Sequence, residues 1–162
     1  TAISGKGMGA ANSSGVEASP FWPILLASFL ETTKDEIASK AFSYRFFVGF
    51  DRGDPVFDSD GSRDIFVRKF TAAVSAAGAA AVVVHAAAEP SDDVPGGACD
   101  SGCVAQPPGG SVALHFLRLD GCEHAPSWAV GQMAQIAFDL GTDYLYQLND
   151  DSSLTTSGWS GM

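Results

Sequence analysis

Positive charge is scarce in this sequence. Lysine and arginine number 9 against 19 aspartate and glutamate residues, which leaves a formal net charge of −10 over 162 residues. Proteins that bind nucleic acid need basic patches for the phosphate backbone, so this composition argues against nucleic acid as a partner. It does not exclude nucleotides, because a bound metal ion changes the sign of the local charge.

Long apolar runs are also missing. No run reaches the roughly 20 apolar residues of a membrane-spanning helix. The longest, residues 79–88, is rich in alanine and valine and contains His85, so it fits a buried strand better. No basic and apolar regions of a signal peptide open the sequence. Its start at Thr1, and its end soon after an acidic motif, lead us to expect a processed or excised piece.

Cysteine is too sparse for a strong zinc motif. A structural zinc ion needs about four ligands with matching spacing. Cys99, Cys103 and Cys122 reach that number only with His115 or His124, in a weakly matching pattern. A loop disulfide between two of the three cysteines and ordinary reduced thiols both remain as alternatives.

Catalytic side chains are equally few. The sequence has no serine nucleophile elbow and no convincing Cys–His pair. His85 and His115 lie within apolar stretches and are expected to be core histidines. His124 precedes a predicted helix in a loop and is the histidine best placed to touch a ligand.

The remaining composition is that of one folded domain. With 46% apolar and 17% charged residues, the chain is globular and long enough for its own core. Residues 1–19 are small and polar and predict a flexible N-terminal segment, whereas residues 20–162 predict a single domain. Residues 5–9 superficially resemble a phosphate loop but lack its spacing, so we expect a flexible loop there.

Apolar strands alternate with amphipathic helices along the rest of the chain. Because the strands are apolar on both faces, we predict an α/β fold, a Rossmann-like three-layer α/β/α sandwich with a mainly parallel sheet. Phe66, Phe70, Val74 and Ala77 share one face of the second helix. The predicted helices are residues 20–37 after a cap at Ser19, residues 62–78 from a cap at Ser62 to Gly78, and residues 127–141 from a cap at Ser127 to Gly141. Residues 24–30 alone could instead be a strand. The predicted strands are residues 42–50, 81–86, 111–119 and 143–148, and residues 89–110 form a long loop.

An acidic turn follows the last predicted strand. Asn149, Asp150 and Asp151 come directly after residues 143–148. Mg²⁺ and Mn²⁺ prefer oxygen ligands, and one or two carboxylates usually hold such a cation while phosphates and water complete its shell. The carboxyl end of a strand in an α/β sheet is a common ligand position. The three residues therefore predict a metal half-site, although an ordinary turn uses the same residue types.

A second acidic group follows the strand predicted at residues 42–50. It comprises Asp51, Asp54, Asp58 and Asp60. In a parallel sheet Asp51 and Asp54 would lie at the same edge as the acidic turn, where a carboxylate could accept hydrogen bonds from a ribose or a base. A solvated acidic loop is the alternative.

Residues 44–55, residues 143–151 and the later Gly158-Trp159 pair resemble the nucleotide-binding half of GT-A-type, nucleotide-sugar-dependent glycosyltransferases. The resemblance covers residues 20–159 and implies a GT-A-like fold that stops before the acceptor-binding half. In that family an Asp-x-Asp motif holds Mn²⁺ or Mg²⁺ against the diphosphate of the sugar donor. The resemblance implies that Asp151 matches the last aspartate and Asn149 the first, with Asn in place of Asp. It places Asp150 near the donor ribose or sugar and Asp51 near the base or ribose.

Three functional hypotheses follow, the last of which is a generic α/β nucleotide-binding domain whose resemblance to the family is accidental. The first is a glycosyltransferase-like domain that binds a nucleoside diphosphate sugar through a divalent cation and transfers a glycosyl group as part of a longer protein. The second is a non-catalytic structural or interaction subunit of a larger assembly that keeps a degenerate form of the fold. The resemblance implies the lumen of the Golgi or endoplasmic reticulum. No residue of the sequence stands out as the catalytic base.

Overall fold

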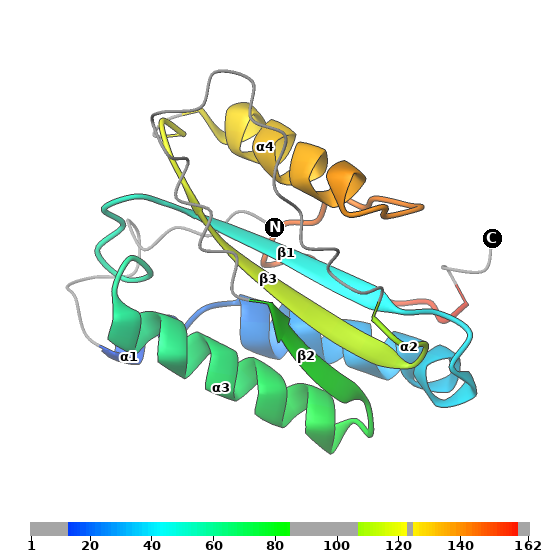
Figure 1. Ribbon diagram of the computed structural model, residues 1–162. Coiled ribbons are helices and arrows are strands. Elements are labelled where there is room, and N and C mark those ends of the chain that lie inside the picture. The colour runs from blue at the N-terminus through cyan, green and yellow to red at the C-terminus, as the bar shows by residue number, and fades with distance from the viewer. Residues whose placement is uncertain (1–12, 85–106, 123–124, 159–162) are drawn as a thin grey trace.

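The computed structural model describes residues 13–84, 107–122 and 125–158. Within these ranges the chain forms a small open sheet with helices around it, which confirms the predicted α/β class (Figure 1). Several features of the sequence analysis lie outside the described residues, namely residues 5–9, His85, residues 89–106 with Cys99 and Cys103, His124 and Trp159.

The sheet has three strands in the order β1-β3-β2. β1 (Tyr44–Asp51) and β2 (Ala80–Val84) each pair in parallel with the central β3 (Ser111–Leu119). The register sets Tyr44 opposite Val112 and Ala80 opposite Ser111, so all the strands begin at one edge of the sheet. β3 is buried over almost its whole length, as expected for a central strand that is apolar on both faces.

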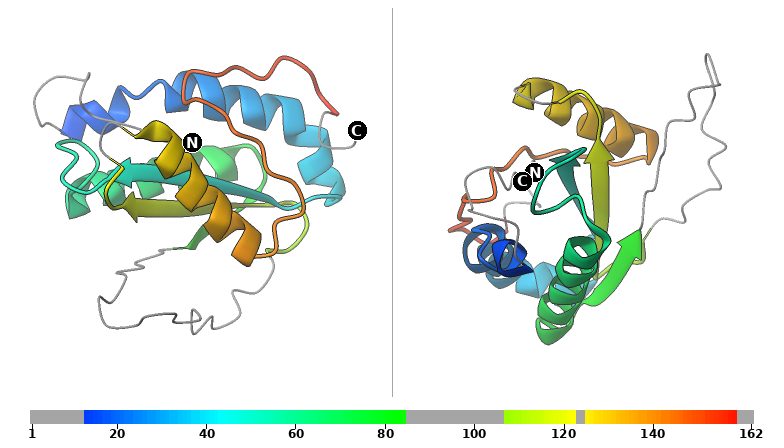
Figure 2. Two further views of the ribbon diagram at one scale, coloured as in Figure 1. Left: turned by 90° about the horizontal axis from the view of Figure 1, so that it is seen from above. Right: turned by 90° about the vertical axis from the view of Figure 1, so that its left-hand side faces the viewer.

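Helices cover both faces of this sheet. The π-helical segment η1 (Phe21–Leu26) runs into α2 (Ala27–Ser39), and these lie on one face with α1 (Ser13–Glu17) and α3 (Asp60–Ala76). α4 (Pro126–Asp139) lies on the opposite face (Figure 1 and Figure 2). The layers are therefore compatible with a Rossmann-like arrangement. None of the helices in the described ranges is long and apolar enough to cross a membrane.

Two hydrophobic clusters fill the two sides of the sheet. The larger is rich in phenylalanine and joins α2 and α3 to the sheet. The smaller joins α4 to the sheet through Phe47, Leu117 and Met133. The domain was predicted to begin at residue 20. Val16 of α1 is fully buried in the larger cluster, so the packed structure begins earlier.

Helix starts differ from the predicted caps. Ser59, not Ser62, caps α3, because its hydroxyl accepts a hydrogen bond from the Ser62 backbone N–H at 3.2 Å. α4 begins at Pro126, whose ring fixes φ at a helical value, so Ser127 lies inside the helix and is no cap. Pro20, not Ser19, occupies the cap position of η1, although the Ser19 hydroxyl accepts a hydrogen bond from the Phe21 N–H at 3.3 Å. Ala77 follows the last residue of α3 and is exposed, so it does not belong to the buried face.

The strand predicted at residues 143–148 is wrong. These residues are irregular, and Tyr144, Leu145 and Tyr146 are 79%, 54% and 56% exposed. They run beside β1 and enclose a groove with it instead of pairing with it. The physical reason is that tyrosine and leucine are stable in a strand when their side chains pack against a neighbouring strand. The local sequence pattern does not show whether such a neighbour is present.

Lys40 marks a place where the backbone restricts the residue type. It ends α2 in the left-handed conformation, with φ of 58°. We expect Lys40→Gly to stabilise the fold by about 0.5–1 kcal/mol, because glycine adopts this conformation without the steric cost of a Cβ. Urea unfolding measures the change. Ser39→Gly, one residue earlier in the helix, is the matched control and should destabilise; a loss of stability in both variants would contradict the prediction.

Candidate functional site

The acidic turn forms as a compact loop closed by hydrogen bonds between its ends. The Asn149 backbone N–H donates to the Ser152 hydroxyl at 3.1 Å, and the Ser152 N–H donates to the Asn149 carbonyl at 3.0 Å. Asp150 and Asp151 lie between these two residues. Asp151 is exposed and Asp150 is half-buried. Hydrogen bonds between Asn149 and Ser152 thus close the turn.

Apolar residues on both sides fasten the turn to the domain. Leu148 before it and Leu154 after it pack against the larger hydrophobic cluster. The Leu154 N–H also donates to the Ser28 hydroxyl of α2 at 3.0 Å. The acidic turn is therefore held against the α2 layer by its flanks, while its aspartates stay accessible.

The two aspartates influence each other electrically. Burial raises the pKa of the Asp150 carboxyl above its ordinary value, and the negative charge of Asp151 raises it further. A cation bound between them would relieve the repulsion and favour both ionised forms. Within the described ranges no group of three or more His, Cys, Asp or Glu side chains could hold a metal. A metal here would thus take two carboxylates, with Asn149 in support, and draw its other ligands from phosphate and water.

A groove of about 800 Å³ begins at Asn149. Its sides are β1 with the residues before it, α2, the inner face of α4, and the irregular residues 141–149. Phenylalanine, tyrosine and aliphatic side chains make up most of the lining. The acidic turn therefore lies at the end of a ready-made cavity of ligand size.

The groove carries little charge. Arg45 and Asp143 are the charged residues of its lining. The Arg45 guanidinium donates to the Leu140 carbonyl at 2.9 Å, which ties β1 to the end of α4. Burial lowers the pKa of Arg45 from its ordinary value.

Asp54 and Asp58 serve the loop after β1. One Asp54 carboxylate oxygen accepts from the backbone N–H groups of Val56 and Phe57, both at 2.9 Å, and the residue is only 5% exposed. One Asp58 oxygen accepts from the Gly53 N–H at 2.6 Å and from Arg118 at 2.7 Å. Asp54 and Asp58 therefore help to build this loop, and the solvated-loop alternative does not describe these two residues, whereas the Asp60 side chain is 93% exposed.

Asp51 and the acidic turn occupy different surroundings. Asp51 ends β1 opposite Leu119, and its charge acts on Cys122. The carboxylate that acts on Asp150 is Asp151. The predicted meeting of the two acidic groups at one sheet edge depended on a strand at residues 143–148, which the structure lacks. Of the predicted site residues, the structure brings together Asn149, Asp150 and Asp151.

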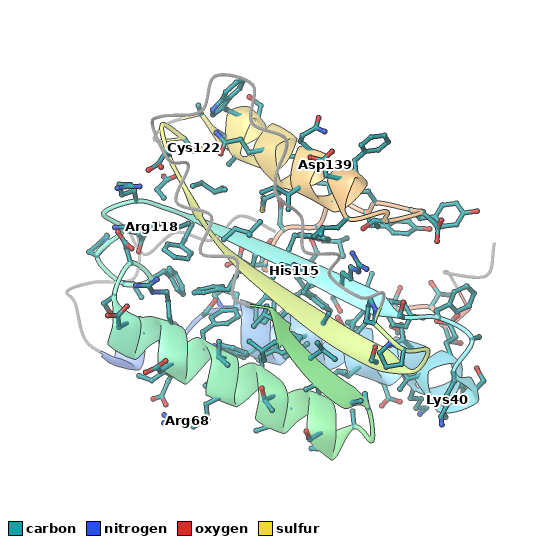
Figure 3. The ribbon with its side chains drawn as sticks, in the orientation of Figure 1. Lys40, Arg68, His115, Arg118, Cys122 and Asp139 are labelled. Carbon is teal, nitrogen blue, oxygen red and sulfur yellow. The ribbon has the colours of Figure 1, made fainter. Side chains whose placement is uncertain are left out.

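His115 behaves as the core histidine that was predicted. It is 1% exposed near the middle of β3, and its ring stacks on Phe47 with centroids 4.5 Å apart (Figure 3). Burial and the positive charge of Arg45 lower its pKa to about 4. The side chain is therefore neutral at pH 7 and has no access to a ligand at the surface.

Cys122 follows β3 as a buried free thiol (Figure 3). Burial raises its pKa, and the negative charges of Asp51 and Asp120 raise it further. A high pKa keeps the sulfur protonated, which suits neither a nucleophile nor a zinc ligand. The described residues thus give no support to zinc binding at this position.

The groove is the feature that sequence reasoning missed. Tyr144 and Tyr146 were assigned to a sheet strand, and Phe42 and Tyr44 to the core, yet all of them line the groove. The available signal was the density of aromatic residues in two short stretches, residues 42–47 and 144–146.

Comparison of the chain with protein-family models, curated proteins and solved structures found no match.

Proposed function

We propose that this chain is a glycosyltransferase-like domain that binds a nucleoside diphosphate sugar through Mn²⁺ or Mg²⁺ at the acidic turn. Asp151 and Asp150 hold the cation and Asn149 supports them. The observation that carries the proposal is a pair of neighbouring carboxylates that directly follow Asn149, a residue of the lining of a ligand-sized groove; one of the two carboxylates is already partly desolvated. The resemblance of residues 44–55 and 143–151 to the glycosyltransferase pattern supports the choice of ligand.

The small number of acidic ligands has a consequence for binding. A cation held by two carboxylates and an amide keeps most of its shell open, and a diphosphate fills those positions. The metal therefore neutralises the phosphate charge that the protein, with a net charge of −10, would otherwise repel. We expect the metal and the nucleotide to bind together, each weakly without the other. Asp150 and Asp151 would hold the cation, which in a longer protein would supply electrostatic stabilisation of the departing diphosphate during glycosyl transfer.

Calorimetric titration with uridine and guanosine diphosphates tests the proposal. Binding is expected with Mn²⁺ and not in the presence of a chelator. Asp151→Ala should weaken the Mn²⁺-dependent binding about tenfold or more, which corresponds to about 1.4 kcal/mol. Asp64→Ala, on the exposed surface of α3, is the matched control and should bind as the parent does. Equal binding by the Asp151→Ala protein and the parent would remove the acidic turn from the site.

A structural or interaction subunit is the second candidate function. It is favoured by large apolar side chains on the surface, since Trp128 and Phe138 of α4 are 60% and 75% exposed. In this candidate function the two exposed rings would contact another protein of the assembly. A melting temperature unchanged by millimolar nucleotide with Mn²⁺ would favour this candidate over the first.

A further inference from the structure

The outward side of α4 lacks the charge that the other long helices expose. α2 and α3 both present charged side chains to water, namely Glu31, Lys34, Asp35, Asp60, Asp64 and Arg68. α4 has one charged residue, Asp139, and its exposed positions include Trp128 and Phe138, which are 60% and 75% exposed. A helix that is apolar on all sides is usually buried on all sides. Because the sheet covers only one side of α4, we expect a partner on the other (Figure 1).

Four residues make up this outward side. Successive residues of an α-helix are turned by about 100° and advance by about 1.5 Å. Met133 is 5% exposed and belongs to the smaller hydrophobic cluster, so its direction marks the buried side of α4. Gly131 and Gln135 lie within about 20° of the opposite direction. Trp128 and Phe138 lie within about 40° of it, about 15 Å apart along the axis. These four exposed residues are called the outer face of α4 below.

The outer face is self-complementary about its centre. Trp128 and Phe138 are equally far from Met133 along the chain, on opposite sides of it, and so are Gly131 and Gln135. A two-fold axis at the level of Met133 can therefore set Trp128 of each copy against Phe138 of the other, the reciprocal pairing of a closed dimer. Gly131 then faces Gln135. A Cβ added to Gly131 would meet nothing within 4 Å, so the longer side chain has room there.

Charge favours a second copy of the chain as the occupant. Each copy carries −10, so two copies repel each other over most of their surfaces. The outer face contains no ionisable side chain, and its neighbour Asp139 accepts a hydrogen bond from Gln135 at 2.9 Å. Two acidic chains can therefore meet on this face with little repulsion. A basic partner would be attracted to the acidic surfaces elsewhere and would gain nothing from an uncharged face.

The size of the outer face sets the strength of the contact. A buried aromatic side chain covers about 150–250 Å², so four rings that are more than half exposed in the free chain bury roughly 400–700 Å². Even with neighbouring side chains, this area is at the low end for specific interfaces, below about 1,200 Å². We therefore expect a dissociation constant of about 10–100 µM, as is usual for weak, transient contacts.

From these observations we infer that the outer face of α4 binds a second copy of this chain. The product is a weak two-fold dimer in which Trp128 of each copy packs on Phe138 of the other. The inference goes beyond the proposed nucleotide binding, because no residue of the outer face lines the groove or belongs to the acidic turn. It names a partner for the two rings that the interaction-subunit candidate also uses, and it holds equally for an enzyme.

Sedimentation equilibrium from well below to well above the expected dissociation constant tests the inference. The average mass of the parent should rise from that of one chain towards that of two. Trp128→Lys and Phe138→Glu should each stay monomeric, because every dimer would bury the new charge against a ring. Ala72→Lys is the matched control, since it adds a lysine to the exposed side of α3 on the opposite face of the sheet, and it should dimerise as the parent does. Melting curves confirm that all variants are folded.

An equal mixture of Trp128→Lys and Phe138→Glu tests which residues face each other. At one end of the mixed dimer the new lysine faces the new glutamate, and at the other end an intact Phe138 faces an intact Trp128. Reciprocal pairing therefore predicts that the mixture dimerises although neither variant does alone, whereas pairing of like residues predicts monomers. A parent that stays monomeric, variants that still dimerise, or a mixture without dimers would overturn the inference. Mn²⁺-dependent binding at Asp151 should be the same in these variants, so the two proposals fail separately.

Discussion

Phe66→Ala is expected to lower the free energy of unfolding by about 4 kcal/mol, within the range measured for phenylalanine truncation in protein cores. Phe66 of α3 is 0% exposed. Its ring centroid lies 4.5 Å from that of Trp22, 4.6 Å from Phe116 and 5.1 Å from Phe21. The side chain therefore joins α3 both to η1 and to the central strand, and its removal takes away contacts on every side.

The loss should be visible as a large decrease in the urea midpoint. A domain of this size is stable by roughly 5–15 kcal/mol, so 4 kcal/mol is a large part of the total. Phe138→Ala makes the same chemical change at a position that is 75% exposed, and we expect it to alter stability by less than about 0.5 kcal/mol. Similar losses in the two variants would show that Phe66 does not occupy the core as described.

The strands of the sheet could be predicted from the sequence because each is a short apolar run between turns. β3 occupies the predicted residues 111–119, and β1 lies within two residues of its predicted start. Such runs are recognisable locally, since burial on both faces requires an apolar residue at every position. The buried face of Phe66, Phe70 and Val74 was likewise visible from helical spacing.

Features that depend on pairing or on a specific backbone conformation could not be predicted. Residues 143–148 have the mainly apolar composition of a buried strand, yet they lie beside β1 without pairing. The choice between Ser59 and Ser62 as the cap of α3 depends on which of them has extended backbone angles, and both are serine. Both candidate caps are the same residue type, so only the folded structure shows which serine caps the helix.

The candidate site likewise has parts that could be predicted from the sequence and parts that could not. The acidic turn formed where local chemistry placed it, because Asn149 and Ser152 close a turn through their own hydrogen bonds. The predicted closeness of Asp51 to the acidic turn was argued from a strand at residues 143–148, and the structure has no strand there. The groove depends on α4, β1 and residues 141–149 together, and no single stretch of sequence records it.

Acidification from pH 6.5 to pH 4 is expected to remove about 3 kcal/mol of stability through His115 alone, as the size of its pKa shift implies. Burial and the positive charge of Arg45 lower the pKa of His115 from 6.5 to about 4 in the folded protein. The unfolded chain therefore binds a proton in this window that the folded chain does not. Stability is fully present above pH 6.5, and it falls as the pH decreases through the window.

His115→Gln separates this effect from the protonation of carboxylates, which both proteins share. The variant loses the ring that stacks on Phe47, so it should be less stable than the parent at pH 7. It has no group that titrates at this position, so its stability should decrease less between pH 6.5 and pH 4, and the two curves should converge towards acid. Urea unfolding at half-unit pH intervals gives both curves. Parallel curves would mean that the imidazole protonates equally well in the folded protein, which is incompatible with a buried histidine that stacks on Phe47 and feels the positive charge of Arg45.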